Sequence, residues 1–223
     1  MTTQGIEVIP GIFEKDPAII QERVQKVASY VKWVQIDIAD GKLVPNTSLL
    51  DPSLIRDTLK YPVNYELHMM VDDPISRSDA WVEAGVRRLL WHVESSDIQQ
   101  LTNNKQQLAE KVLFYKNKGV EVGLVLDKQT AVDAVFPFLE MIDCVLIMTI
   151  QAGFSGQKFL PDMLEKVRAV RERAPRLPIE VDGGINFDTG PISVRAGATR
   201  LVSTSTIYNS EHISEAINRL RNS

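Results

Sequence analysis

The sequence predicts a single (β/α)8 barrel that spans residues 1–223. Short runs of β-branched and aliphatic residues alternate with longer amphipathic stretches, which is typical of βαβ units and a parallel sheet. The length of 223 residues lies within the ~200 to 250 that such barrels occupy as one domain. No linker rich in Pro, Gly or Ser divides the chain. The main alternative is an open, doubly wound sheet.

Eight aliphatic runs have the length and composition of buried strands. We expect strands at residues 6–9, 33–38, 63–70, 88–92, 121–126, 144–148, 178–181 and 200–202. Helical spacing of apolar residues predicts helices at residues 17–30, 75–84, 99–118, 131–138, 160–173 and 212–221. In the last of these, Ile213, Ala216, Ile217 and Leu220 form one stripe, as expected of a helix packed on the barrel.

The composition excludes several classes of protein. The chain is 44% hydrophobic and 24% charged with a net charge of −4, which describes a globular protein. There is no basic run of the kind that binds nucleic acid, no secretory signal pattern, and no apolar segment of the ~18 residues that a membrane helix needs. Cys144 is the single cysteine, so no internal disulfide forms, and we expect it to be a buried core thiol. We expect a cytoplasmic protein; a homo-oligomer is compatible with the sequence.

Polar residues at the carboxyl ends of the strands are the candidates for the active site, because barrel enzymes bind their substrates there. Gln35 and Asp37 stand two apart, so both side chains lie on one face of a strand. We assign Asp37 a functional role. Asp40 precedes Gly41, and we expect Asp40 to stabilise a turn.

Two further strand ends carry ionisable residues. His68 lies among apolar neighbours and, taken alone, is a core residue. Asp182 is followed by Gly183 and Gly184, which either form an ordinary turn or let the backbone approach a ligand. Together, two carboxylates and an imidazole from three strand ends form a plausible set of ligands for a divalent cation.

Three glycine- or hydroxyl-rich loops follow the last three predicted strands. They contain Gly153, Phe154, Ser155 and Gly156, then Gly183 and Gly184, then Thr204 and Ser205. Backbone N–H groups in such loops bind anions, and barrels often hold phosphate between the loops after strands seven and eight. The order of the loops therefore predicts a phosphate site for a small sugar phosphate.

The segments IPGIF, IDIADGKLVPN, ELHMMVDDP, HVESS, MTIQAGFSGQKF, IEVDGGIN and LVSTSTIY resemble, in this order, those of the ribulose-phosphate 3-epimerase family. The resemblance implies a barrel that interconverts D-ribulose 5-phosphate and D-xylulose 5-phosphate through an enediolate. It implies that Asp37 and Asp182 are both acid/base residues and metal ligands, that His68 is a further ligand, and that Met70 and Met148 line the site. At a buried strand position, methionine is also an ordinary core residue.

The chain departs from this family's pattern at several site positions. Gln35 stands where the family has its other metal-binding histidine, Gly11 where it has a serine near the substrate, and Ala39 where it has a third methionine. Gln151-Ala152 replaces Asn-Pro, and Thr204 stands where the family usually has glycine. An amide oxygen of Gln35 would be a weaker ligand for zinc or iron than imidazole, so we expect a metal (Mn, Mg, Fe or Zn) that is weakly bound or lost.

Two classes of function fit these observations. The first is an epimerase that acts at C3 of a phosphorylated ketose, with Asp37 and Asp182 as the acid/base pair. The second is a sugar-phosphate-binding protein without turnover, which the changes at Gln35 and Gly11 favour. An epimerase for a different ketose phosphate is a third possibility.

Overall fold

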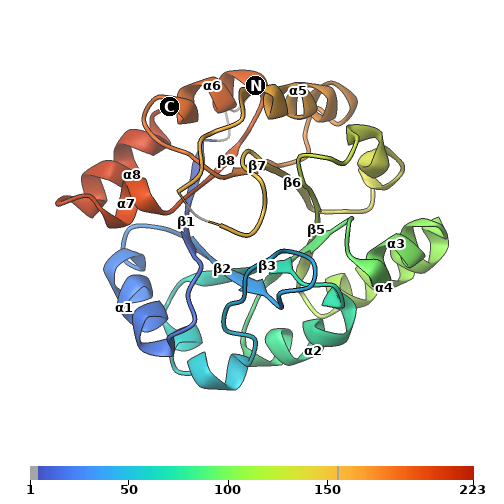
Figure 1. The fold of residues 1–223 in the computed structure, drawn as a ribbon, viewed down its shortest axis with the longest axis horizontal. Coiled ribbons are helices and arrows are strands. Elements are labelled where there is room, and N and C mark those ends of the chain that lie inside the picture. Colours follow the sequence, from blue (N-terminus) through green and yellow to red (C-terminus); the bar gives the residue numbers. More distant parts are fainter. Residues whose placement is uncertain (1–4, 155) are drawn as a thin grey trace.

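The computed structural model describes residues 5–154 and 156–223. Its strands form a closed barrel in the order β1 to β8, and every neighbouring pair is parallel. Helices surround the barrel on all sides (Figure 1). The predicted (β/α)8 barrel is therefore confirmed, and the open sheet is excluded because β1 pairs with β8 as well as with β2.

All eight predicted strands are present. Their bounds are β1 Glu7–Ile12, β2 Trp33–Ala39, β3 Asn64–Met70, β4 Arg88–His92, β5 Glu121–Leu126, β6 Cys144–Met148, β7 Ile179–Asp182 and β8 Arg200–Ser203. The largest difference is at β1, which continues three residues past the predicted end at Ile9. Pro10 and Gly11 disfavour a strand interior, but closure of the barrel gives Pro10 a partner in β8 and Gly11 a partner in β2.

The helices differ more from the prediction. They are α1 Pro17–Val27, α2 Pro74–Ala84, α3 Ser96–Thr102, α4 Lys105–Asn117, α5 Leu164–Arg173, α6 Thr189–Ala196, α7 Ser205–Tyr208 and α8 Ile213–Arg221, with 3-10 turns at Pro52–Ile55, Thr58–Lys60, Val132–Phe138 and Pro161–Met163. The predicted helix at 99–118 is two helices, because the Asn104 side chain accepts hydrogen bonds from the backbone N–H groups of Gln106 and Gln107 and starts α4. The predicted helix at 131–138 is a 3-10 segment that contains Pro137.

The apolar core has two parts. The larger lies between the strands and the helices that surround them. The smaller includes Met70, Leu90, Cys144 and Met148 from several different strands. Cys144 is fully buried, which raises the pKa of its thiol to about 12 and agrees with an inert core role. In the described residues, no helix is long and apolar enough to cross a membrane.

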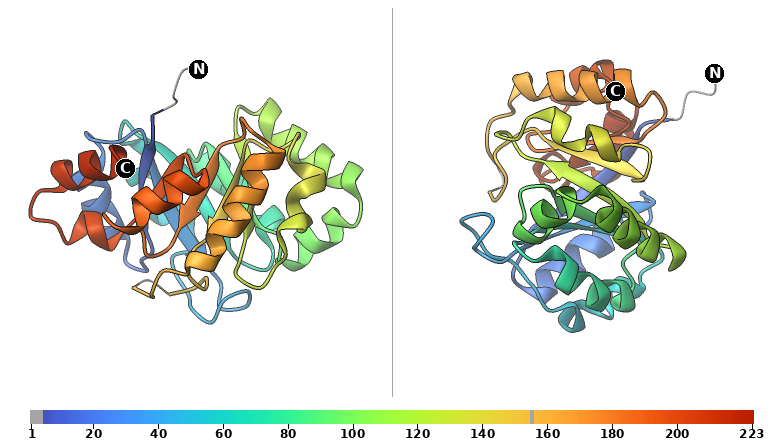
Figure 2. Two further views of the ribbon diagram at one scale, coloured as in Figure 1. Left: turned by 90° about the horizontal axis from the view of Figure 1, so that it is seen from above. Right: turned by 90° about the vertical axis from the view of Figure 1, so that its right-hand side faces the viewer.

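The loops after β2 and β6 project from the same face of the barrel, opposite the side from which the chain enters (Figure 2). They touch each other, because Asn46 Nδ2 donates a hydrogen bond of 2.9 Å to the carbonyl of Gly153. A Cβ atom on Gly153 would lie 2.9 Å from Val44 Cβ, so glycine permits this close approach. The two loops therefore border one shared mouth.

Candidate active site

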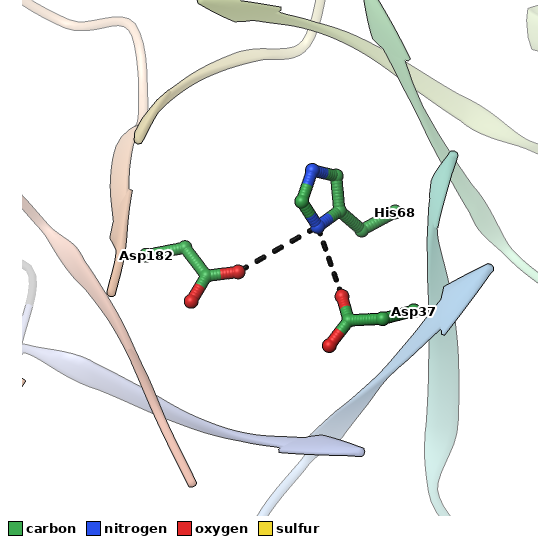
Figure 3. Close-up of side chains that lie close together, drawn as sticks. All are labelled: Asp37, His68 and Asp182. Atoms are coloured by element: carbon green, nitrogen blue, oxygen red, sulfur yellow. Dashed lines mark hydrogen bonds and ion pairs between the residues drawn. The ribbon is translucent and has the colours of Figure 1, made fainter. Parts of the chain in front are cut away.

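Asp37, His68 and Asp182 converge inside the barrel (Figure 3). Asp37 and His68 are register partners on β2 and β3, so their side chains leave the sheet on the same face, and Asp182 is the last residue of β7. His68 Nδ1 lies 2.9 Å from Asp37 Oδ1 and 3.6 Å from Asp182 Oδ2. The sequence thus correctly predicts that these three residues meet.

Gln35 lies between the two carboxylates. Its side chain is fully buried, and Nε2 donates hydrogen bonds of 2.7 Å to Asp37 Oδ1 and 2.8 Å to Asp182 Oδ2. Its Oε1 atom has no hydrogen-bond partner among the described residues, which is costly for a buried acceptor. Gln35 was expected to present its carbonyl oxygen to a metal, but here the amide nitrogen faces the carboxylates.

Burial and charge act on Asp182. Burial is the largest cause of its raised pKa and the nearby Asp37 carboxylate adds to it, whereas His68 and the hydrogen bond from Gln35 lower it. The net effect raises the pKa of Asp182 to about 7. Asp182 can therefore hold a proton near neutral pH in the metal-free protein, as a general acid must.

The three ionisable residues fit a divalent cation. One ligand atom from each lies within 4.8 Å of the other two, and carboxylate with imidazole suits manganese, iron or zinc. Gln35 fits only after its amide turns over, which would also give the unpaired Oε1 a partner. Asp37, His68 and Asp182 thus form the possible metal site, and Gln35 is outside it in the observed orientation.

Comparison with known proteins identifies the family. The profile of the Ribulose-phosphate 3 epimerase family matches residues 7–208. The chain is 35% identical, over 97% of its length and 93% of the relative, to the cytoplasmic isoform of ribulose-phosphate 3-epimerase from Oryza sativa subsp. japonica. The chain belongs to the ribulose-phosphate 3-epimerase family. A member from Bacillus subtilis (strain 168) is 31% identical, with 98% of this chain and 99% of the relative covered.

Two solved structures share the fold at much lower sequence identity. A 3-hexulose-6-phosphate synthase matches with a TM-score of 0.69 at 18% identity, covering 97% of this chain and 99% of that one. KGPDC from Streptococcus mutans matches with a TM-score of 0.72 at 11% identity, covering 98% of this chain and 97% of that one. At these identities the likeness shows the fold alone, and it agrees with the barrel of this epimerase-family chain.

Two adjoining cavities open beside the acidic residues. A small one of about 40 Å³ is lined by Asp37 and His68, with Met70, Met148 and Phe154 among its other walls. A larger one of about 510 Å³ is lined by the loops after β6, β7 and β8, including residues 156, 183, 184, 204 and 205. Asp182 and Thr204 line both cavities. A ligand in the larger cavity can therefore reach the carboxylate pair.

The glycines after β7 are required by the backbone. Gly183 and Gly184 have φ values of +117° and +67°, in the left-handed region that favours glycine. A Cβ atom on Gly184 would lie 3.1 Å from the backbone of Phe159. Replacement of Gly184 would consequently strain the fold as well as any ligand site. Ser155, expected in the phosphate loop, lies outside the described residues.

Gly11 is explained by Thr204. A Cβ atom on Gly11 would lie 2.9 Å from Thr204 Oγ1, a distance that real Cβ atoms essentially never show, and 3.0 Å from Val202 Cγ1, which is unusually tight. Thr204 Oγ1 also donates a hydrogen bond of 3.1 Å to the Gly11 carbonyl. In this chain the Thr204 hydroxyl therefore occupies the space that a side chain at residue 11 would need.

Several residues of the site were not predicted. His92 Nε2 lies 2.9 Å from His68 Nε2, and His92 Nδ1 lies 3.0 Å from Glu94 Oε2. Lys158 lines the larger cavity. His92 ends a predicted strand and Lys158 follows the glycine loop, so the position of each residue in the sequence could have marked it as a candidate site residue. Asp40 behaves as expected of a turn residue, because it accepts from the N–H of Lys42 at 2.9 Å.

Proposed function

We propose that this chain is an epimerase that inverts C3 of a phosphorylated ketose and interconverts D-ribulose 5-phosphate and D-xylulose 5-phosphate. Membership of the ribulose-phosphate 3-epimerase family supports the reaction. One structural observation carries the mechanism: carboxylates from β2 and β7 meet in the barrel, each bonded to the same amide nitrogen.

Inversion next to a ketone needs two groups that exchange protons with opposite faces of a planar intermediate. In our proposal Asp37 removes the C3 proton of one epimer, the electrons move onto the C2 oxygen, and Asp182 delivers its proton to C3 from the other face. The reverse reaction exchanges these roles. In the metal-free protein, burial and the nearby Asp37 carboxylate raise the pKa of Asp182 to about 7, and a bound cation would lower it.

A divalent cation would be held by Asp37, His68 and Asp182, and Gln35 would be a fourth ligand after its amide rotates. Such a cation would stabilise the negative charge that develops on the C2 oxygen. The oxygen-rich set favours manganese or magnesium over zinc. Met70 and Met148 form an apolar wall that keeps water from the intermediate. Gly11 borders the Gln35 amide, because a Cβ atom on Gly11 would lie in ordinary contact with Nε2, 3.8 Å away.

The phosphate group belongs, in our proposal, in the larger cavity. Gly156, Gly183, Gly184, Thr204 and Ser205 line this cavity, whereas Gly153 and Phe154 line the small one. Hydroxyl groups and backbone N–H groups of these loops would bind the phosphate oxygens. Lys158 is the cation among the described residues that line the cavity. The distance between phosphate and carboxylates then selects the chain length of the sugar.

The test compares C3 epimerisation of D-ribulose 5-phosphate by the wild type, Asp37→Asn, Asp182→Asn and the control Asp188→Asn. Asp188 lies on the loop after β7, six residues beyond Asp182, and is exposed. We expect both site variants to lose at least ~100-fold in rate, as removal of a positioned acid or base does, and Asp188→Asn to keep its rate. A wild type that binds the sugar phosphate without turnover would instead identify a binding protein.

A further inference from the structure

The hydrogen bonds behind His68 form a continuous chain that reaches the loop after β5. Glu94 Oε1 accepts a hydrogen bond of 2.9 Å from the backbone N–H of Asp127. Glu94 Oε2 faces His92 Nδ1 at 3.0 Å, and His92 Nε2 faces His68 Nε2 at 2.9 Å. His68 Nδ1 then faces Asp37.

The first link of this chain sets the tautomer of His92. A carboxylate only accepts hydrogen bonds, so the hydrogen between Glu94 and His92 must be on His92 Nδ1. Burial raises the pKa of Glu94, but hydrogen bonds from His92, Thr130 and the N–H of Asp127 outweigh burial and lower this pKa to about 2. Glu94 is therefore ionised at neutral pH.

The second link sets the tautomer of His68. A neutral His92 with its hydrogen on Nδ1 can only accept at Nε2, so the hydrogen between the two rings must be on His68 Nε2. With a cation bound, Nδ1 of a neutral His68 would carry a free lone pair, because the cation would replace the hydrogen that the Asp37 carboxylate, 2.9 Å away, otherwise requires on Nδ1. This lone pair is directed at Asp37 and Asp182, where a cation would sit.

We infer that Glu94 and His92 are positioning residues that hold His68 in the Nε2–H tautomer and so keep Nδ1 available as a metal ligand. The inference rests on the proposed metal-assisted function, which it deepens. The arrangement of the rings supports the inference, because His68 and His92 are nearly parallel, with an interplanar angle of 22° and centroids 5.0 Å apart, and they meet edge to edge at their Nε2 atoms. Both are buried, so water does not compete for their nitrogens.

Glu94→Gln should reverse the donor and acceptor of each hydrogen bond from residue 94 through His92 to His68. The Asp127 N–H is a fixed donor, so it will take the new amide oxygen and leave the amide NH2 facing His92 Nδ1. His92 must then accept at Nδ1 and donate from Nε2, which forces the hydrogen of His68 onto Nδ1. That hydrogen occupies the position of the cation.

His92→Phe makes a different change. It keeps an aromatic ring beside His68 but removes the acceptor, so His68 can adopt either tautomer. If the two residues had a merely structural role, His92→Phe should lower metal affinity more than Glu94→Gln, because it removes a buried histidine rather than exchanging one oxygen for NH2. If they control the tautomer, Glu94→Gln should lower metal affinity more than His92→Phe.

The experiment measures Zn²⁺ affinity by calorimetry, and the protonation of each His68 nitrogen by ¹⁵N NMR in the Zn²⁺-saturated protein. The control is Asp97→Asn, a partly buried carboxyl at the start of α3 whose Oδ2 accepts from the Ile75 N–H at 2.9 Å, away from the histidines. We expect Glu94→Gln to lose ~10 to 100-fold in affinity, His92→Phe to lose less, and Asp97→Asn to match the wild type. In the wild type, Nε2 of His68 should be protonated and Nδ1 metal-bound.

Unchanged Zn²⁺ affinity in Glu94→Gln, or a protonated Nδ1 in the Zn²⁺-saturated wild type, would overturn the inference. Both readouts are independent of turnover. A weakened Glu94→Gln variant together with a wild type that does not epimerise would support the tautomer control and refute the proposed reaction.

Discussion

The contact between Gly11 and Thr204 gives a sharp test of how the site is packed. The φ of Gly11 lies outside the left-handed region, so alanine is allowed there by the backbone. Gly-to-Ala changes at such positions stabilise by ~0.4 to 1 kcal/mol through the unfolded state. The new Cβ would lie 2.9 Å from Thr204 Oγ1 and 3.0 Å from Val202 Cγ1, and overpacking of this kind costs ~1 to 3 kcal/mol. The net effect of Gly11→Ala is therefore a loss of up to ~2.5 kcal/mol.

The clash between a side chain at residue 11 and Thr204 Oγ1 can be relieved by substitution of Thr204. Thr204→Ala alone should cost ~0.5 to 1.5 kcal/mol, because it removes the hydrogen bond to the Gly11 carbonyl. In the Gly11→Ala/Thr204→Ala double variant the two effects should not add, with a coupling of ~0.5 to 3 kcal/mol that favours the pair. Thr204→Val is the matched control, since a methyl group replaces Oγ1 and keeps the clash.

Urea unfolding of the single and double variants measures these free energies. Rescue by Thr204→Ala but not by Thr204→Val is the expected result. Strictly additive free energies in the alanine pair would refute the claim that Thr204 occupies the space of a side chain at residue 11.

Further predictions concern the metal, the pH dependence and the ion pairs at the other end of the barrel. Gln35→His should raise Mn²⁺ and Zn²⁺ affinity by at least ~10-fold, because it adds a nitrogen ligand where an NH2 group now faces the carboxylates. Equilibrium dialysis measures both affinities. Tight stoichiometric binding of zinc by the wild type would contradict this prediction. The pKa of Asp182 is raised to about 7, so in the metal-free protein its contribution to stability is present below the unfolded pKa and is lost as the pH rises through about 7. Urea unfolding in EDTA should therefore show a fall in stability between pH 5 and pH 8 that is smaller in Asp182→Asn, and equal slopes would refute the raised pKa. Arg88 is fully buried and pairs with Glu66 and with Glu121 Oε2 at 2.7 Å, so Arg88→Met should destabilise the fold by ~3 to 5 kcal/mol because buried carboxylates lose their partner. Thermal unfolding tests this, and an unchanged melting temperature would contradict it.

The strands were predictable because buried parallel strands leave unbroken aliphatic runs, as at Cys144–Met148. The short α6 and α7 were missed because they have few apolar residues at helical spacing. The helix break at Asn104 was a visible capping signal within a longer amphipathic pattern. Side-chain capping thus set a helix boundary that the spacing of apolar residues did not indicate.

The convergence of Asp37, His68 and Asp182 followed from the rule that strand ends share one face of the barrel. The orientation of Gln35 could not be predicted, since its amide can present either end to the carboxylates. The space at Gly11 depends on Thr204, which is 193 residues away in the sequence. Contacts between β1 and β8 arise only when the barrel closes, so no local pattern contains them.

The most direct test of two carboxylates acting from opposite faces is the first turnover of D-ribulose 5-phosphate in deuterium oxide. Two bases exchange separate protons, so the account predicts D-xylulose 5-phosphate that carries deuterium at C3 from the earliest conversion, while the remaining substrate keeps its hydrogen. Nuclear magnetic resonance of both sugars at low conversion measures this. Product that retains the original C3 hydrogen would show that one group carries the same proton across, and would contradict the roles proposed for Asp37 and Asp182.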